Sequence, residues 1–287
     1  MQVQLREGFV QVRDLRLHYL GWGEKGPPVV LHHATGFLAY LWQPIAQLLA
    51  HRYQVLAYDA RGHGDSDKPE TGYQWTELVE DLLAFIDAMG WTQAALVGHS
   101  SGGAAALAAA ALRPQLVVRV VALEPVIFPP EIPQDSRSHE MAEIARKRRV
   151  VWPSRQELME AYRQRAAFAR WDEEVLRLYV EHGTFQRPDG QIELKMPGHL
   201  EALVYEGGVA LDTWALLPQV RCPVLVVRGG EADSPLYKAA ELVTSRLANA
   251  RLVTVKEGSH FFPMEVPHQT AQLVWDFLAE EPLWAPS

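Results

Sequence analysis

Short apolar runs and longer amphipathic stretches alternate through the first half of the chain, and this alternation most constrains the fold. Four runs have the length and composition of buried strands: 29–33, 54–58, 94–97 and 117–123. The stretches between them read as helices: 42–50, 75–89 and 104–112. Strands joined by helices lie parallel in one sheet that helices cover on both faces. Alternating apolar and polar residues over 9–20 predict an antiparallel hairpin in front of it. The chain is therefore predicted to adopt an α/β fold.

An interruption of this pattern begins after Glu124-Pro125. Proline-rich residues lead into charged stretches with helical spacing, at 137–151, 154–169 and 172–182. The sheet pattern then resumes with two strands and a closing helix, at 222–227, 251–255 and 269–278. Ligands of parallel sheets bind beyond the carboxyl ends of the strands, so an insertion at that edge would roof the site. We expect a core domain at 1–128 and 209–287 and a helical cap (lid) domain at 129–208.

The segment Gly98-His99-Ser100-Ser101-Gly102-Gly103 lies between a predicted strand and a predicted helix. A serine at the apex of so tight a turn has a strained backbone, and its flanking glycines avoid a Cβ collision. The free N–H groups of the following helix point toward negative charge that develops beside the serine. The segment predicts a nucleophilic Ser100; the alternative is a small-residue turn that only lets the helix pack closely on the sheet.

A nucleophilic serine needs a base, usually a histidine held by a carboxylate. His260 is the expected base, because it lies on a loop directly after the last predicted strand. Asp233 is the expected carboxylate, on the loop after strand 222–227, although it could instead cap the next helix. Glu124, at the end of strand 117–123, is the rival acid, and the sequence leaves open whether it assists or replaces Asp233.

The oxyanion formed in acyl transfer needs hydrogen-bond donors. We expect the backbone N–H groups of Ser101 and Thr35 to supply them, the latter from the loop His32-His33-Ala34-Thr35-Gly36-Phe37. The paired histidines have no clustered acidic or cysteine partners in the sequence, so no metal site is expected. Aromatic residues of the cap and residues near the elbow are expected to line a substrate pocket: His33, Phe37, His99, Glu124, Trp152, Phe168 and Phe261.

Composition limits the partners of the chain. With 27 basic and 35 acidic side chains its formal charge is −8, which disfavours nucleic acid. The basic run Arg146-Lys147-Arg148-Arg149 is expected on the solvated face of a helix. The single cysteine, Cys222, cannot form an intrachain disulfide, and neither a signal peptide nor a membrane span is recognisable. We expect a cytoplasmic monomer or homodimer that acts on a small molecule, with no membrane partner.

These residues resemble the α/β-hydrolase family. The order Ser100, Asp233, His260 is that family's order, and Asp59-Ala60-Arg61-Gly62-His63-Gly64-Asp65-Ser66-Asp67 resembles the D-x-R-G-x-G-x-S loop of its capped members. The closing Gly258-Ser259-His260-Phe261 is also similar. The resemblance is strongest to the epoxide hydrolase, haloperoxidase and esterase-like group. It implies a mostly parallel eight-stranded sheet with a helical cap inserted after strand 6.

Two departures refine the expected activity. Epoxide hydrolases and haloalkane dehalogenases of this family carry aspartate at the elbow apex, where this chain has Ser100, so ring opening and dehalogenation are disfavoured. The usual His-Gly pair of the oxyanion loop is His33-Ala34 here. We expect a cofactor-free serine hydrolase that cleaves carboxylic esters of small to medium acyl chain through an acyl-enzyme. The alternatives are a lactonase, a carbon–carbon bond hydrolase, a haloperoxidase-like perhydrolase and, less favoured, a non-catalytic small-molecule receptor.

Overall fold

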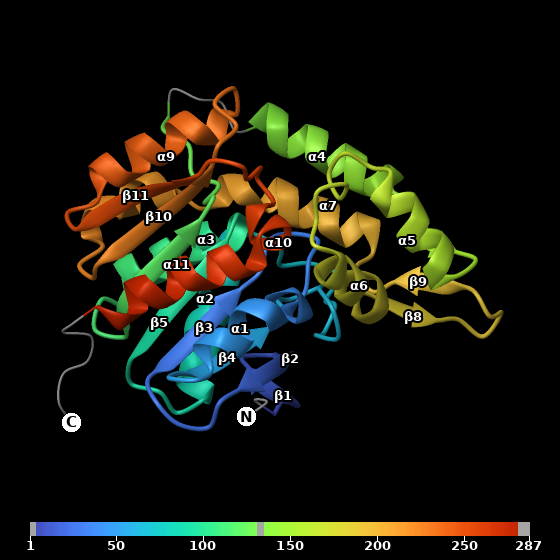
Figure 1. Ribbon diagram of the computed structural model, residues 1–287, viewed down its shortest axis with the longest axis horizontal. Helices are drawn as coiled ribbons and strands as arrows, with labels where there is room; N and C mark the ends of the chain where they lie inside the picture. The colour runs from blue at the N-terminus through green and yellow to red at the C-terminus, as the bar shows by residue number, and fades with distance from the viewer. Residues whose placement is uncertain (1–3, 131–134, 281–287) are drawn as a thin grey trace.

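The computed structural model describes residues 4–130 and 135–280 and contains one large sheet. Its strand order is β1-β2-β4-β3-β5-β6-β10-β11 (Figure 1). The strands are β1 (Arg6–Val12), β2 (Leu15–Trp22), β3 (Pro28–His32), β4 (Gln54–Tyr58), β5 (Ala94–His99), β6 (Val117–Leu123), β10 (Val224–Gly229) and β11 (Ala250–Val255). The hairpin β1–β2 is antiparallel and joins β4 antiparallel, whereas the six strands from β3 onward run parallel. The predicted eight-stranded, mostly parallel sheet is confirmed.

Helices cover both faces of this sheet because its strands are apolar on both sides. In β3, Val29 and Leu31 pack into one cluster with α1 (Gln43–Leu49) and α11 (Pro267–Ala279). Val30 between them packs on the opposite face with α2 (Trp75–Ala88), α3 (Ser101–Leu112) and α9 (Pro235–Arg246). Shorter helical segments complete the core: η1 (Ala39–Trp42), α8 (Thr213–Leu216), η3 (Leu217–Gln219) and α10 (Phe262–Glu265). None of the described helices is long and apolar enough to cross a membrane.

A cap region is inserted between β6 and β10, as expected. Its elements are α4 (Asp135–Lys147), β7 (Val151–Trp152), α5 (Arg155–Arg163), α6 (Glu173–His182), β8 (Thr184–Gln186), β9 (Ile192–Leu194), α7 (Gly198–Glu206) and η2 (Gly207–Ala210). They gather at the upper right of Figure 1, where α7 packs along α4.

The cap is not purely helical, which corrects the sequence expectation. The strands β7, β9 and β8 form a small antiparallel sheet. The helix predicted over 137–151 ends at Lys147, and Val151 already pairs with Glu193. The helix predicted over 154–169 likewise ends at Arg163. Strands of two or three residues are too short to show an alternating pattern, so tertiary pairing alone reveals them.

Candidate active site

Ser100 lies at the sharp turn between β5 and α3, at the carboxyl edge of the parallel strands. Its φ of 57° and ψ of −117° lie outside the regions favoured for non-glycine residues. The flanking glycines make this turn possible: a Cβ on Gly98 would lie 2.1 Å from the Gly102 carbonyl, and one on Gly102 would lie 2.3 Å from the His32 carbonyl. The backbone N–H of Ser101 opens α3 and has no partner inside that helix. The turn therefore presents one hydroxyl next to a free backbone donor.

His260 meets this serine from the loop that follows β11. Its Nε2 lies 3.1 Å from Ser100 Oγ, within hydrogen-bond distance. Burial lowers the pKa of His260 to about 4, so the imidazole is neutral at pH 7 and can accept a proton. His99 donates from Nε2 to the His260 carbonyl at 2.8 Å, and burial lowers the pKa of His99 to about 3. A neutral His99 therefore holds the backbone of His260 in place.

The same loop is braced from its other side by Glu265 of α10. The Glu265 carboxylate accepts hydrogen bonds from the Ser259 N–H at 2.8 Å and from the Ser259 hydroxyl at 2.6 Å. Sequence analysis did not identify Glu265 as part of the site. Its position six residues after Ser259 carries no motif that would have identified it.

The two acids considered from the sequence lie in different surroundings. Asp233 is exposed on the turn before α9, and its carboxylate contacts no hydrogen-bond or ion-pair partner in the described residues. The N-cap of α9 is Ser234, not Asp233. Glu124 is 3% exposed and has a positive φ of 44°, and its carboxylate accepts a hydrogen bond from the Gly229 N–H. Burial raises the pKa of Glu124 to about 7.

Glu124 thereby approaches the backbone that carries His260. A Cβ on Gly229 would lie 2.7 Å from the carbonyl oxygens of both Gly258 and Ser259, so Gly229 is wedged between Glu124 and the histidine loop. The other ring nitrogen of His260, Nδ1, is buried and finds no hydrogen-bond partner among residues 4–130 and 135–280. Of the two acids, only Glu124 is buried beside this loop.

Two neutral histidines hold the expected oxyanion loop. His33 donates from Nδ1 to the Ala34 carbonyl at 2.8 Å and accepts from the Ala60 N–H at 3.0 Å. His63, which sequence analysis did not assign to the site, accepts from the Gly36 N–H at 3.0 Å. Burial lowers the pKa of His63 to about 3, which keeps its acceptor nitrogen unprotonated. The sequence feature that could have identified His63 as a site residue is its position in the Asp59–Asp67 motif.

Thr35 is held by the elbow itself. Its N–H donates to Ser101 Oγ at 3.0 Å, and its hydroxyl donates to the same oxygen at 3.0 Å. The Thr35 N–H thus points toward the elbow, but in this structure it already donates a hydrogen bond to the Ser101 hydroxyl. Of the two expected oxyanion donors, the Ser101 N–H alone has no hydrogen-bond acceptor within the described ranges 4–130 and 135–280.

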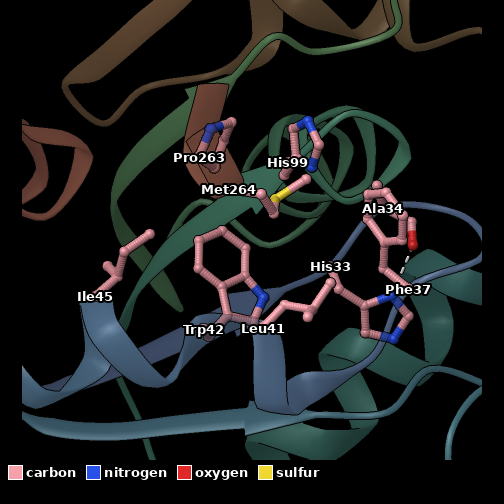
Figure 2. A pocket seen from close by; sticks show the side chains of 9 residues that line it. All are labelled: His33, Ala34, Phe37, Leu41, Trp42, Ile45, His99, Pro263 and Met264. Atoms are coloured by element: carbon pink, nitrogen blue, oxygen red, sulfur yellow. Dashed lines mark hydrogen bonds between the residues drawn. The ribbon is translucent and has the colours of Figure 1, made fainter. Parts of the chain in front are cut away.

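Aromatic side chains lie beside the reacting pair: the rings of His99 and Phe261 are each 5.1 Å from that of His260. A pocket is lined by His33, Ala34, Phe37, Leu41, Trp42, Ile45, His99, Pro263 and Met264 (Figure 2). Phe37 stacks with His99 at 6.2 Å between ring centroids and meets Phe261 at 5.9 Å. From Phe37 a chain of aromatic contacts runs into the cap through Trp171 and Phe168 to Tyr162. Trp152, an expected pocket residue, contacts Tyr162 at 6.2 Å, at the far end of this series of aromatic contacts.

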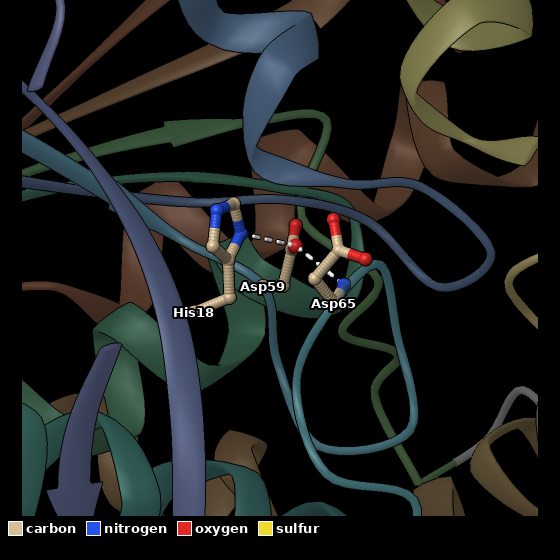
Figure 3. Close-up of side chains that lie close together, drawn as sticks. All are labelled: His18, Asp59 and Asp65. Atoms are coloured by element: carbon tan, nitrogen blue, oxygen red, sulfur yellow. Dashed lines mark hydrogen bonds and ion pairs between the residues drawn. The ribbon is translucent and has the colours of Figure 1, made fainter. Parts of the chain in front are cut away.

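One group of acidic and histidine side chains has the spacing of metal ligands: His18, Asp59 and Asp65 (Figure 3). The Asp59 oxygens already accept protein donors. His18 Nδ1 lies 2.7 Å from Oδ2, the Ala39 N–H donates to Oδ1 at 2.7 Å, and the Asp65 N–H donates to Oδ2 at 2.9 Å. This network explains the proximity of the three residues as a buried ion pair that joins separate chain segments.

Known proteins resemble this chain in sequence and in fold. The model of the alpha/beta hydrolase family matches residues 29–273. The 2-(acetamidomethylene)succinate hydrolase of Mesorhizobium japonicum is 31% identical over 255 residues, which are 88% of this chain and 88% of that protein. Epoxide hydrolase 4 of Mus musculus is 27% identical over 299 residues, covering 95% and 79%. The crystal structure of an E-2-(acetamidomethylene)succinate hydrolase superposes with a TM-score of 0.83 at 23% identity, covering 96% of this chain and all of that one.

Proposed function

This chain belongs to the alpha/beta hydrolase family, and we propose that it is a serine hydrolase that cleaves carboxylic esters through an acyl-enzyme. The observation that carries the proposal is the 3.1 Å contact between Ser100 Oγ and His260 Nε2 at a strained turn. Strained backbone that surrounding structure holds in place is concentrated at functional sites. A serine beside a neutral imidazole has the pairing that nucleophilic catalysis requires.

The reaction follows from the roles of these residues. Ser100 Oγ attacks the ester carbonyl carbon while His260 Nε2 takes its proton, and the carbonyl oxygen becomes an oxyanion. The Ser101 N–H donates to that oxyanion, and the Thr35 N–H joins it when the Ser101 hydroxyl turns away. His260 then protonates the leaving alcohol. The acyl group stays on Ser100; His260 next takes a proton from water, whose oxygen attacks the acyl carbon, and returns that proton to Ser100 Oγ as the acyl–oxygen bond breaks and the acid leaves.

We further propose that Glu124, rather than Asp233, supports His260. Four observations favour it: the burial of Glu124, its positive φ, its contact with Gly229 and the exposure of Asp233. A carboxylate that turns toward His260 Nδ1 would satisfy that buried nitrogen and stabilise the imidazolium formed during the reaction. Strain at Glu124 is consistent with such a role, since its carboxylate is held at the carboxyl edge of β6.

The alternative activities differ in the substrate from which the acyl-enzyme forms. Cleavage of lactones, cleavage of carbon–carbon bonds in diketones and peracid formation would all use the same serine and histidine, and the relatives' names include two kinds of hydrolase and a chloroperoxidase. Ring opening by an aspartate ester stays disfavoured because the apex residue is Ser100. A panel of p-nitrophenyl esters of increasing acyl length, lactones and diketones separates these reactions. A receptor would instead bind tightly with negligible turnover.

Ser100→Ala tests the nucleophile. We expect it to reduce turnover of p-nitrophenyl acetate and butyrate by at least about 10³-fold, with an unchanged melting temperature, because it removes only the attacking oxygen. A fluorophosphonate should label the wild-type protein and not the variant. Ser245→Ala, on the exposed side of α9, is the matched control. Wild-type turnover by Ser100→Ala would refute the assignment.

A further inference from the structure

Arg148 is buried, although it belongs to a basic run that sequence analysis expected on a solvated helix face. Its neighbours in the run follow that expectation in part: Lys147 is 78% exposed, and Arg146 pairs at the surface with Glu143 and Glu206. The Arg148 side chain is only 14% exposed and turns inward after α4 ends. Burying a guanidinium is costly unless it is paired and hydrogen-bonded.

The hydrogen bonding of the Arg148 guanidinium is incomplete. Arg148 Nη2 lies 2.6 Å from Glu201 Oε2 and donates to the Met196 carbonyl at 3.1 Å. Arg148 Nε is buried and has no hydrogen-bond partner in the part of the chain that the structure describes. A guanidinium carries five N–H donors in a planar fork suited to a carboxylate. Buried polar groups without a partner are uncommon, and a bound ligand is one explanation for such a group.

This guanidinium lines a cavity on the cap side of the oxyanion loop. Gly36, Phe37, Tyr179 and Met196 also line the cavity. The Tyr179 hydroxyl donates to the Gly36 carbonyl at 3.0 Å, and a methyl group on Gly36 would lie 2.5 Å from Glu201 Oε1. Gly36 directly follows Thr35, whose N–H contacts the elbow. The Phe37 ring contacts His99, Phe261 and Tyr179, at 6.2, 5.9 and 5.7 Å between ring centroids.

We propose that Arg148 binds an ionised carboxylate at the far end of the acyl group, so that the preferred substrates are esters of dicarboxylic acids. The inference rests on the proposed function and adds a substrate class to it. The ester carbonyl lies at Ser100, the acyl chain passes the Phe37 ring, and the terminal carboxylate accepts hydrogen bonds from the guanidinium. Lys195 also lines the cavity, but its ammonium pairs with Asp65. Both lining cations are paired, Lys195 with Asp65 and Arg148 with Glu201, and Arg148 has a buried donor, Nε, that finds no partner in the described residues.

The test compares mono-p-nitrophenyl esters of dicarboxylic acids with the same esters whose free carboxyl is methylated. We expect wild-type protein to prefer the acidic ester in kcat/KM, mainly through KM. Arg148→Gln should lower the acidic-to-neutral ratio by about 10- to 100-fold, the range for lost hydrogen bonds to a charged group. Arg148→Lys should keep part of the preference. Lys147→Gln, which makes the same charge change at an exposed neighbour, should leave the ratio unaltered.

An equal ratio in wild type and Arg148→Gln, with neutral esters still hydrolysed, would overturn the carboxylate site and leave the proposed function standing. If the wild-type protein hydrolyses neither ester and takes no fluorophosphonate, the proposed function fails instead. The site is then judged by binding. Adipate monomethyl ester should raise the melting temperature of Ser100→Ala protein and should not do so when Arg148→Gln is added; no shift in either overturns the site.

Discussion

Glu124 and Asp233 can be separated by amide substitutions that change little besides charge. If the Glu124 carboxylate stabilises the His260 imidazolium, Glu124→Gln should lower kcat/KM by roughly 10⁴-fold, since loss of the triad acid is of that order. Asp233→Asn should stay within a few-fold of wild type, because the Asp233 side chain is exposed. A larger loss in Asp233→Asn than in Glu124→Gln would reverse the assignment.

The pH profile provides a second readout that a structural role for Glu124 would not produce. Burial raises the pKa of Glu124 to about 7, so wild-type kcat/KM should fall as pH drops through about 7 and the carboxylate is protonated. Glu124→Gln removes this titrating group and leaves His260, whose pKa burial lowers to about 4. The acid limb of Glu124→Gln should therefore move to lower pH. An unmoved limb would show that Glu124 does not act on His260.

At this scale the sequence predicted residue types better than their orientations. Ser100 and His260 were identifiable because glycines and loop position mark them. The different surroundings of Glu124 and Asp233 were not, because they depend on a positive φ at Glu124 and on how far the loop after β10 reaches into solvent. The inward turn of Arg148 likewise depends on where α4 ends.

Between elements, Arg170 links the cap to both loops of the catalytic edge. It lies before α6, donates to the Glu257 carbonyl, and lies 3.6 Å from Glu231 and 3.4 Å from Glu265. Because Glu265 braces the histidine loop, loss of Arg170 should loosen the cap against that loop. Arg170→Gln is expected to raise amide hydrogen exchange over 164–172 several-fold, as measured by mass spectrometry.

The control is Arg177→Gln, a cap arginine whose ion pair with Glu181 stays within α6. Its exchange over 164–172 should match wild type. Salt should mimic the Arg170 substitution in the wild-type protein, since these ion pairs are half exposed and screened by ions. Equal exchange in both variants would mean that the cap is held by its aromatic contacts alone.

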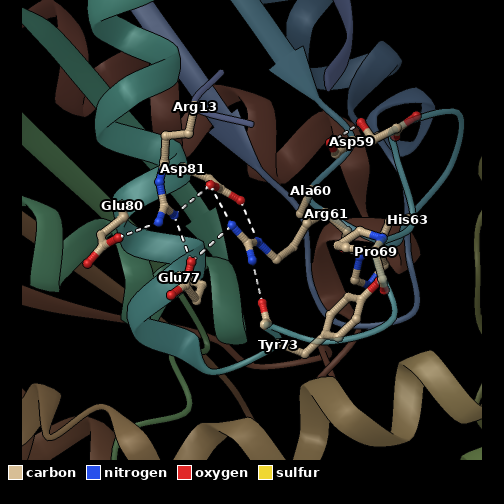
Figure 4. Close-up of polar contacts among 12 residues, drawn as sticks. Arg13, Asp59, Ala60, Arg61, His63, Pro69, Tyr73, Glu77, Glu80 and Asp81 are labelled. Carbon is tan, nitrogen blue, oxygen red and sulfur yellow. Dashed lines mark hydrogen bonds and ion pairs between the residues drawn. The ribbon is translucent and has the colours of Figure 1, made fainter. Parts of the chain in front are cut away.

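The loop over 59–73 contains the Asp59–Asp67 motif, and the side chains of this loop hold neighbouring segments in place. Arg61 donates two hydrogen bonds to the carboxylate of Asp81 in α2, from Nε at 2.6 Å and from Nη2 at 2.8 Å (Figure 4). Because Arg61 is held in this way, His63, two residues later, is positioned to accept the hydrogen bond from the Gly36 N–H. Core elements were predictable because apolar periodicity marks them, whereas this bracing joins residues that no local pattern connects. The packing of α7, which is most extensive along α4, likewise joins residues that no local sequence pattern connects.

Across the whole molecule, the Asp59 carboxylate joins β2, η1 and the loop after β4. Hydrogen bonding and charge from His18 lower the pKa of Asp59, although burial opposes this, and the pKa of His18 is raised. The Asp59 contribution to stability is present above about pH 4 and is lost as pH falls through its lowered pKa. The His18 contribution is present below about pH 6.5 and is lost as pH rises through its raised pKa. Their combined stabilisation is therefore largest at intermediate pH.

Asp59→Asn should accordingly lower the free energy of unfolding by about 3 kcal/mol near pH 5.5, the cost of breaking a buried ion pair. The difference from wild type should shrink as pH rises through the raised pKa of His18, because the imidazole then loses its charge and only its hydrogen bond to the carboxylate remains. Urea unfolding of both proteins over a series of pH values measures this. Asp14→Asn is the control, because it makes the same charge change at an exposed turn residue outside this network. A difference that does not vary with pH would mean that the network stabilises the fold by hydrogen bonding without the charge on His18.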